Sequence, residues 1–293
     1  MLALWLENNK LSLRDDVPIP EPPTGEALVR VLRSGICNTD LELVRGYYPY
    51  SGTLGHEFVG RVEEGPPELR GRRVVGEINA VCGECQTCYN GHPTHCENRT
   101  VLGIVGRHGS FAEYLTLPVD NLHLVPDEVS TNAATFTEPL AAALQIQQQI
   151  KVCSDNRVIV VGDGKLGQLV SQTLALTGCD LLTVGRHQSK LDLLDTLGIR
   201  TSLTESVESH AFDIAVECTG NAEGFLVARG SLRPRGTLVM KSTYVGELTW
   251  DASSVVVDEI TVLGSRCGRF EPALRLLSEH QLEIDPLIHA CYP

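Results

Sequence analysis

The pattern of apolar and polar positions divides the chain into two parts with different expected folds. From Leu2 to about Leu124, apolar residues occur in short runs, such as residues 27–32, 58–62 and 73–75, that are interrupted by Gly and Pro. Short runs bounded by turn-forming residues are typical of β-strands joined by loops. The first part is therefore expected to be an irregular β domain.

After Pro126 the pattern becomes one of alternating helices and strands. Thr137 is expected to cap a helix that begins at residues 138–139 and continues through an Ala-, Leu- and Gln-rich stretch to residue 150. A fully apolar strand at residues 157–161 precedes a glycine-rich turn and apolar residues at helical spacing. Further apolar strands are expected at residues 181–184, 212–216, 237–240 and 260–263. This alternation predicts an α/β domain with a parallel sheet covered on both faces.

Length and charge limit the classes of protein that fit. A chain of 293 residues exceeds the usual size of a single core and predicts about two domains. Its formal net charge of −13 would repel a phosphate backbone, so nucleic acid is not an expected partner. The N-terminus lacks a basic start and a long apolar run, so we expect neither a signal peptide nor a membrane span there. The expected location is the cytoplasm.

Four of the ten cysteines form a cluster in the first part of the chain. The cluster consists of Cys82, Cys85, Cys88 and Cys96. Four thiolates on one loop match the tetrahedral sulfur coordination of structural zinc, and a closed shell leaves no position for a substrate. His92 and His95 lie inside the loop but are not needed as ligands. The alternative is that these cysteines stay reduced or form disulfides.

A second metal site is predicted from residues about twenty positions apart. Cys37 and His56 supply a thiolate and an imidazole, and a catalytic zinc needs one more protein ligand and an open position. Two carboxylates compete for the third place. Glu57 directly follows His56, whereas Glu138 lies at the start of the helix expected at the domain boundary.

A dinucleotide site is predicted at the turn after residues 157–161. The turn has the form G-x-G-x-x-G and opens a helix, and its expected cofactor-binding residues are Gly162, Gly164, Lys165, Leu166 and Gly167. In this context the glycines allow the tight turn, the close approach of the backbone to a pyrophosphate and the packing of the helix on the strand. The helix N-terminus favours the negative charge of the pyrophosphate.

The end of the next strand predicts which nicotinamide cofactor is used. An acidic residue that binds the ribose 2′-hydroxyl of NAD is expected about twenty residues after the first glycine. Gly185 occupies that position, and Asp180 lies at the opposite end of the strand. Arg186 and Lys190 could bind a 2′-phosphate. The sequence therefore predicts that NADP is favoured over NAD.

Together these motifs resemble the zinc-dependent medium-chain dehydrogenases, which include alcohol, sorbitol, threonine and some glucose dehydrogenases. The resemblance covers nearly the whole chain and includes the cysteine loop, the glycine turn and residues 35–40, 55–57, 109–114, 138–139, 213–220 and 264–265. It implies a GroES-like catalytic domain at residues 1–137, a Rossmann domain at 138–266, and a segment at 267–293 that returns to the catalytic domain. It also implies that Cys37 and His56 bind catalytic zinc, that Thr39 relays the substrate proton, and that Asp40 orients His56.

The resemblance also narrows the expected function. Glu138 stands where ethanol-type enzymes carry a cysteine, which favours a polyol or sugar over a simple alcohol as substrate. Glu42 replaces the histidine that many relatives use in the proton relay, and the chain is expected to be shortened at its C-terminus. A homodimer or homotetramer is expected. The alternative function is a non-catalytic, zinc-stabilised protein that binds a dinucleotide as a sensor.

Overall fold

The computed structural model describes residues 1–244 and 247–292, which form two compact units. Unit 1 comprises Met1–Glu138 and Arg269–Gln281, and unit 2 comprises Pro139–Gly268 and Leu282–Pro293. Residue 293, the last of the C-terminal segment expected at 267–293, lies outside the described residues. Within the described residues, no helix is both long and apolar enough to cross a membrane.

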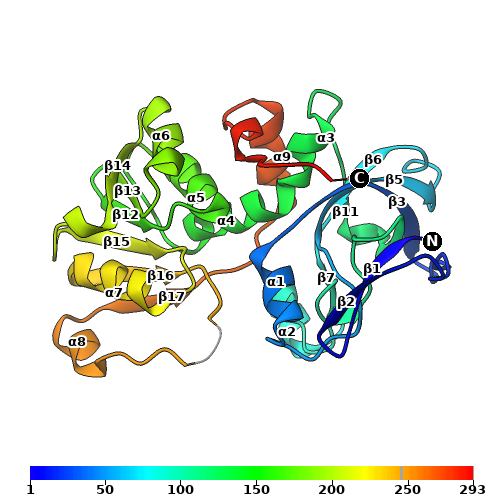
Figure 1. Cartoon of the computed structure of the whole chain (residues 1–293), viewed down its shortest axis with the longest axis horizontal. Coiled ribbons are helices and arrows are strands. Elements are labelled where there is room, and N and C mark those ends of the chain that lie inside the picture. Colours follow the sequence, from blue (N-terminus) through cyan, green and yellow to red (C-terminus); the bar gives the residue numbers. More distant parts are fainter. Residues whose placement is uncertain (245–246, 293) are drawn as a thin grey trace. The chain divides into compact units, whose positions relative to one another are not determined.

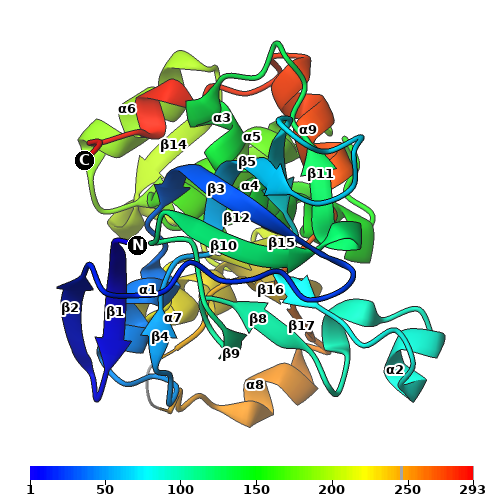
Figure 2. The same ribbon diagram turned by 90° about the vertical axis from the view of Figure 1, so that its right-hand side faces the viewer.

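Unit 1 is built on an antiparallel five-stranded sheet (Figure 2). Its strands, in spatial order, are β10 (Tyr114–Pro118), β3 (Glu26–Gly35), β5 (Glu57–Glu64), β6 (Arg73–Gly76) and β11 (Leu122–Leu124). The register pairs Val29 with Val62, and both side chains are buried. Pairing β3 with β5 also places Gly35 opposite Glu57.

Shorter elements complete unit 1. Two three-stranded sheets contain β1 (Ala3–Glu7), β2 (Lys10–Arg14) and β4 (Gly52–Thr53), and β7 (Asn79–Ala80), β8 (Thr100–Leu102) and β9 (Gly106–Arg107). The helices are α1 (Asn38–Val44), α2 (Gln86–Tyr89), α3 (Thr131–Thr135) and α9 (Phe270–Ser278), with 3₁₀ turns at Pro93–His95 and Val119–Asn121. The prediction of short strands separated by long loops is confirmed.

Unit 2 contains a parallel six-stranded sheet. Its strands, in spatial order, are β14 (Arg200–Leu203), β13 (Asp180–Gly185), β12 (Arg157–Val161), β15 (Phe212–Glu217), β16 (Leu232–Met240) and β17 (Thr261–Gly264). Its helices are α4 (Thr137–Gln149), which begins in unit 1, α5 (Lys165–Ala175), α6 (Gln188–Thr196), α7 (Ala222–Ser231) and α8 (Ala252–Val257), with 3₁₀ turns at Thr204–Ser206 and Asp285–Leu287. Figure 1 shows α5 and α6 on one face of the sheet and α7 and α8 on the other. The predicted doubly wound sheet is thus confirmed.

The strands of unit 2 are apolar because both faces of the sheet are covered. Ile159 and Ala215 are fully buried, and Phe225 of α7 packs edge-to-face against Trp250 with ring centroids 5.1 Å apart. One local prediction is wrong. Thr137 does not cap α4. It is the first residue of that helix, and its hydroxyl donates to the carbonyl oxygen of Ala134 at 2.7 Å.

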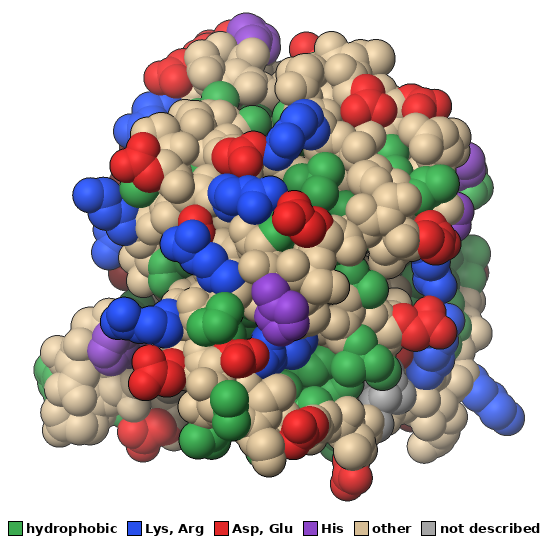
Figure 3. Space-filling view, turned by 90° about the vertical axis from the view of Figure 1, so that its left-hand side faces the viewer, with side chains coloured by type: hydrophobic (Ala, Val, Ile, Leu, Met, Phe, Trp, Pro, Cys, Tyr) green, Lys and Arg blue, Asp and Glu red, His purple; other side chains and the backbone are tan. Residues whose placement is uncertain are grey.

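The charged side chains on the face shown in Figure 3 are mixed in sign. Lys and Arg side chains are interspersed there with Asp and Glu side chains.

Candidate active site

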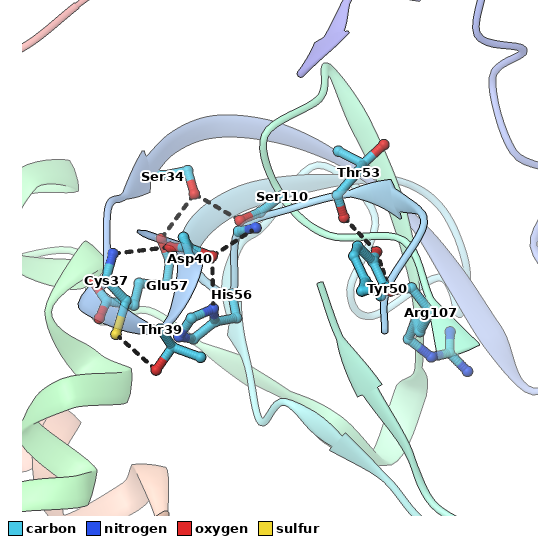
Figure 4. A network of polar contacts seen from close by, with 11 residues as sticks. Ser34, Cys37, Thr39, Asp40, Tyr50, Thr53, His56, Glu57, Arg107 and Ser110 are labelled. Carbon is cyan, nitrogen blue, oxygen red and sulfur yellow. Dashed lines mark hydrogen bonds and ion pairs between the residues drawn. The ribbon is translucent and has the colours of Figure 1, made fainter. Parts of the chain in front are cut away.

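Helix α1 places a buried carboxylate behind the residues of the predicted catalytic metal site (Figure 4). Asp40 is 2% exposed, and its Oδ2 accepts a hydrogen bond from the Cys37 backbone N–H at 2.9 Å. Its Oδ1 accepts from the Gly55 N–H at 3.2 Å and lies 3.3 Å from His56 Nδ1. One carboxylate therefore fixes the backbone at both candidate ligands and the ring orientation of His56. Its contact with Nδ1 leaves Nε2 of the ring as the atom that can bind a metal.

The structure brings three of the predicted ligands together. One ligand atom each from Cys37, His56 and Glu57 lies within 4.8 Å of the others. Burial raises the pKa of the Glu57 carboxyl to about 7, against the opposing effect of His56, and the charge of Glu138 raises it further. Burial likewise raises the pKa of the Cys37 thiol. A buried imidazole next to a thiol and a carboxyl group whose pKa values are both raised is a donor set that a divalent cation would stabilise.

Glu138 lies near this cluster but is not part of it. It is a partly buried residue in the first turn of α4, and its charge raises the pKa of both Cys37 and Glu57. Among the described residues, the group of ligand atoms that lie within 4.8 Å of one another contains Glu57 but not Glu138. A Cβ at Gly35 would lie 2.5 Å from Glu57 Oε2, so only glycine leaves this carboxylate its present place.

Two other residues of α1 bear on the predicted proton relay. Thr39 Oγ1 lies 3.6 Å from Cys37 Sγ, so its hydroxyl is beside the metal site. Glu42 is 8% exposed and accepts a hydrogen bond from Arg45 Nη1 at 2.7 Å. The relay role of Thr39 stays a prediction.

Two serines that the sequence analysis did not single out support the site. Ser34 Oγ donates to the Glu57 carbonyl oxygen at 3.1 Å and lies 2.6 Å from Ser110 Oγ. Ser110 N–H donates to the Gly55 carbonyl oxygen at 2.9 Å. Gly55 has a φ of +94° and would collide with Ser110 if it carried a Cβ. The motif around Ser110 was visible in the sequence, but its contact with Ser34, 76 residues away, was not.

Tyr50 has a structural role in unit 1. Its hydroxyl donates to the carbonyl oxygens of Thr53, at 2.6 Å, and Arg107, at 3.0 Å. Burial raises the pKa of this phenol. Tyr50 thus joins two loops, whereas Tyr47 and Tyr48 are 43% and 44% exposed.

The cysteine loop forms a second, separate cluster. Its four Sγ atoms lie within 4.8 Å of one another, and in the part of the chain that the structure describes neither His92 nor His95 joins them. The sulfurs are thiols, not disulfides. Hydrogen bonds from the backbone of Glu97 and Cys88 lower the pKa of Cys85 to about 6, which favours the thiolate. The predicted four-sulfur site is therefore assembled in a geometry that zinc can use.

The glycine turn has the predicted context between β12 and α5. Gly162 has a φ of +131°, and Gly164 is the N-cap of α5. A Cβ at Gly167 would collide with the Gly162 carbonyl oxygen, so only a glycine at position 167 lets α5 pack this closely against the turn. Lys165 and Leu166 form the first turn of α5. The backbone N–H groups at this helix end are suited to a pyrophosphate.

A carboxylate lies at the end of β13, although the strand itself ends in Gly185. It belongs to Asp163, between the two glycines of the turn, whose Oδ2 accepts from the N–H groups of Arg186 and His187 at 2.8 and 2.7 Å. Gly185 ends the strand as predicted, and the exposed Arg186 lies 3.5 Å from Glu223. Lys190 Nζ lies 3.7 Å from Asp163 Oδ1. Sequence spacing could not reveal that the turn folds back onto a strand end more than twenty residues later.

Comparison with known proteins agrees with this fold. The "Alcohol dehydrogenase GroES-like domain" family matches residues 23–127, and the "Zinc-binding dehydrogenase" family matches residues 166–279. L-threonine 3-dehydrogenase from Streptomyces avermitilis is 30% identical over 94% of this chain and 88% of its own length. Sorbitol dehydrogenase from Halalkalibacterium halodurans is 27% identical over 92% of this chain and 86% of its own length. A crystal structure of a zinc-binding dehydrogenase from Sinorhizobium meliloti bound to NADP has a TM-score of 0.88 at 28% identity, covering 98% of this chain and 91% of that one.

The fold and the two donor clusters define a zinc-type dehydrogenase. The chain belongs to the zinc-dependent medium-chain dehydrogenase family, a family of oxidoreductases. The predicted zinc and nicotinamide cofactors agree with the zinc-binding family that matches and with the NADP bound to the S. meliloti protein.

Removing one cysteine of the four-sulfur cluster is predicted to remove one zinc ion per chain. Cys96→Ser replaces the buried member of the cluster and leaves three sulfur ligands, so the loop should lose its metal and its protection from proteolysis. Metal analysis of the purified protein measures the loss. Cys179→Ser, outside both clusters, is the control. Equal zinc content in the two variants would contradict the assignment.

Asp40→Asn is predicted to weaken zinc binding at the other cluster. The amide retains an acceptor for one backbone N–H but loses the charge beside His56, and groups that orient metal ligands are worth about 10–100-fold in metal affinity. Competition with a chromophoric chelator measures the affinity. Asp120→Asn, at an exposed position of unit 1, should leave it unchanged. An unaltered affinity in Asp40→Asn would show that Asp40 does not support the site.

Proposed function

We propose that this chain transfers a hydride between an alcohol, polyol or sugar and NAD or NADP in a zinc-dependent reaction. The observation that carries the proposal is the group formed by the buried His56 and the partly buried Cys37 and Glu57, with Asp40 behind the imidazole. Three protein ligands with a free fourth position suit a catalytic zinc ion, whereas the four-sulfur cluster has no free position and stabilises the loop. The two clusters therefore have different roles.

The residues of unit 1 have different roles in the proposed reaction. Cys37 and His56 hold the metal, with Glu57 or Glu138 as the third ligand. Zinc supplies Lewis acidity that lowers the pKa of the substrate hydroxyl. Thr39, whose hydroxyl lies beside Cys37, takes the proton that the substrate loses. Asp40 orients the His56 ring.

The residues of unit 2 bind the cofactor. Gly162, Gly164 and Gly167, with the first turn of α5 at Lys165 and Leu166, bind the pyrophosphate. Gly185, Arg186 and Lys190 at the end of β13 would face the adenosine ribose of a bound cofactor, where the two cations would favour NADP slightly. A bound nicotinamide would supply the hydride acceptor, and the residues of unit 2 would position it.

The substrate class is proposed from the carboxylates at the metal site. Glu57 and Glu138 both lie close enough to influence the Cys37 pKa, so the site contains carboxylates and a single cysteine. This composition favours the polyol and sugar branch, and the relatives include a protein called sorbitol dehydrogenase. We also propose a cytoplasmic homodimer or homotetramer.

The proposed reaction predicts turnover with at least one polyol, sugar or secondary alcohol. Zinc-loaded protein is assayed for reduction of NADP and NAD at 340 nm across a panel of these substrates. His56→Ala should lower kcat/KM by at least about a hundredfold, because metal polarisation is worth several kcal/mol. It should also lose one zinc ion while keeping the other. Absence of turnover across the panel with two zinc ions bound would favour the sensor function instead.

The third zinc ligand is predicted to be identifiable from a pair of matched variants. Glu57→Gln and Glu138→Gln each remove one carboxylate charge and preserve side-chain size. The variant that removes the ligand should lose zinc affinity at the catalytic site, while the other should mainly lower kcat. Metal affinity and steady-state kinetics are measured on both. Full retention of zinc affinity in both variants would exclude a glutamate ligand.

A further inference from the structure

Asp163 is a buried acid at the place where the adenosine ribose is expected. It lies between Gly162 and Gly164, is 8% exposed, and reaches across to the end of β13. In dinucleotide-binding domains of this type, an acidic side chain from that strand end binds the ribose 2′-hydroxyl and repels a 2′-phosphate. Here the strand ends in Gly185 and the acid comes from the glycine turn instead.

Gly185 and Asp163 are sterically linked. A Cβ at Gly185 would lie 2.5 Å from Asp163 Oδ2, so a side chain at 185 and the present position of Asp163 exclude each other. The position that a strand-end carboxylate would occupy is thus filled by a carboxylate from residue 163. Asp163 can place its carboxylate at the strand end only because residue 185 is a glycine.

The Asp163 carboxylate uses donors that a cofactor phosphate would need. Besides the N–H groups of Arg186 and His187, it lies 2.9 Å from His187 Nδ1 and 3.7 Å from Lys190 Nζ. Although burial opposes ionisation, the hydrogen bonds from His187 and Arg186 and the charge of Lys190 lower the pKa of Asp163 overall. Two backbone donors, a ring nitrogen and an ammonium group therefore surround an anion that the protein itself supplies.

The loop that carries these donors is fixed in place. Gln168 of α5 donates to the Lys190 carbonyl oxygen at 2.7 Å, and Thr204 donates to the Gly185 carbonyl oxygen at 2.9 Å. The Arg186 side chain, by contrast, is 64% exposed, and its contact with the 84% exposed Glu223 is a weak surface pair. Arg186 is thus more free to turn toward a 2′-phosphate than Lys190, whose Nζ lies 3.7 Å from Asp163.

We propose that Asp163 sets the choice between NAD and NADP by occupying the anion-binding donors at the end of β13. Arg186 attracts a 2′-phosphate, and Asp163 both repels it and holds the neighbouring donors. The result is a small preference in the unmodified chain. This inference rests on the proposed function, because it assumes that a dinucleotide binds at the glycine turn.

The test is the ratio of NADP to NAD affinity in Asp163→Asn. The amide has nearly the same shape but no charge, and it leaves at least one donor available to the 2′-phosphate. The ratio of the two dissociation constants, measured by calorimetry on the zinc-loaded protein, should shift toward NADP by on the order of tenfold, the value of one charge-assisted hydrogen bond. Asp192→Asn removes an exposed charge from α6, the helix that carries Lys190, and should change the ratio little.

A double variant tests the same idea in the opposite direction. Asp163→Gly combined with Gly185→Asp moves the carboxylate to the strand end, where it should exclude NADP by on the order of tenfold or more relative to Asp163→Asn. If Asp163 only stabilises the N-terminus of α6, Asp163→Asn will lower the melting temperature without altering the ratio, and the inference is overturned. Failure of the unmodified chain to bind either dinucleotide would instead overturn the proposed function.

Discussion

Asp40 accepts hydrogen bonds from the backbone at Cys37 and Gly55 and lies 3.3 Å from the His56 ring, so one carboxylate constrains both ends of the candidate catalytic site. A charge that is 2% exposed is costly unless donors satisfy it. Here the donors are backbone N–H groups in the segments that carry Cys37 and His56. The hydrogen bonds that satisfy the carboxylate therefore also position the candidate metal ligands. The geometry of Cys37 and His56 therefore depends on a residue that need not touch the metal.

The two clusters differ in how far they could be predicted from the sequence. The four-sulfur cluster is local, because all its members lie on one loop and their spacing indicates the coordination directly. The other cluster needs the register of β3 and β5, which places Gly35 opposite Glu57 and leaves room for its carboxylate. Spacing identified Cys37 and His56 but could not choose between Glu57 and Glu138. Their proximity is a property of the folded chain.

The same distinction explains what was found and missed in unit 2. Its strands were predictable because a sheet covered on both faces needs continuous apolar runs, and the glycine turn was predictable because backbone geometry demands glycine there. Asp163 was missed because its partners, Arg186 and His187, are more than twenty residues away. An absent side chain at Gly185 suggested an absent charge, whereas the space was filled from another segment. The contact of Asp163 with Arg186 and His187 therefore places a carboxylate where the residue at position 185 alone indicated none.

The central claim is that one chain holds two zinc ions on two different donor sets, one structural and one catalytic. Anomalous diffraction at the zinc edge from crystals of the zinc-loaded protein tests this claim most directly. The account predicts two peaks, one surrounded by four sulfur atoms at the cysteine loop and one between Cys37 and His56 with a carboxylate as third ligand. A single peak at the cysteine loop, with none at Cys37 and His56, would contradict it.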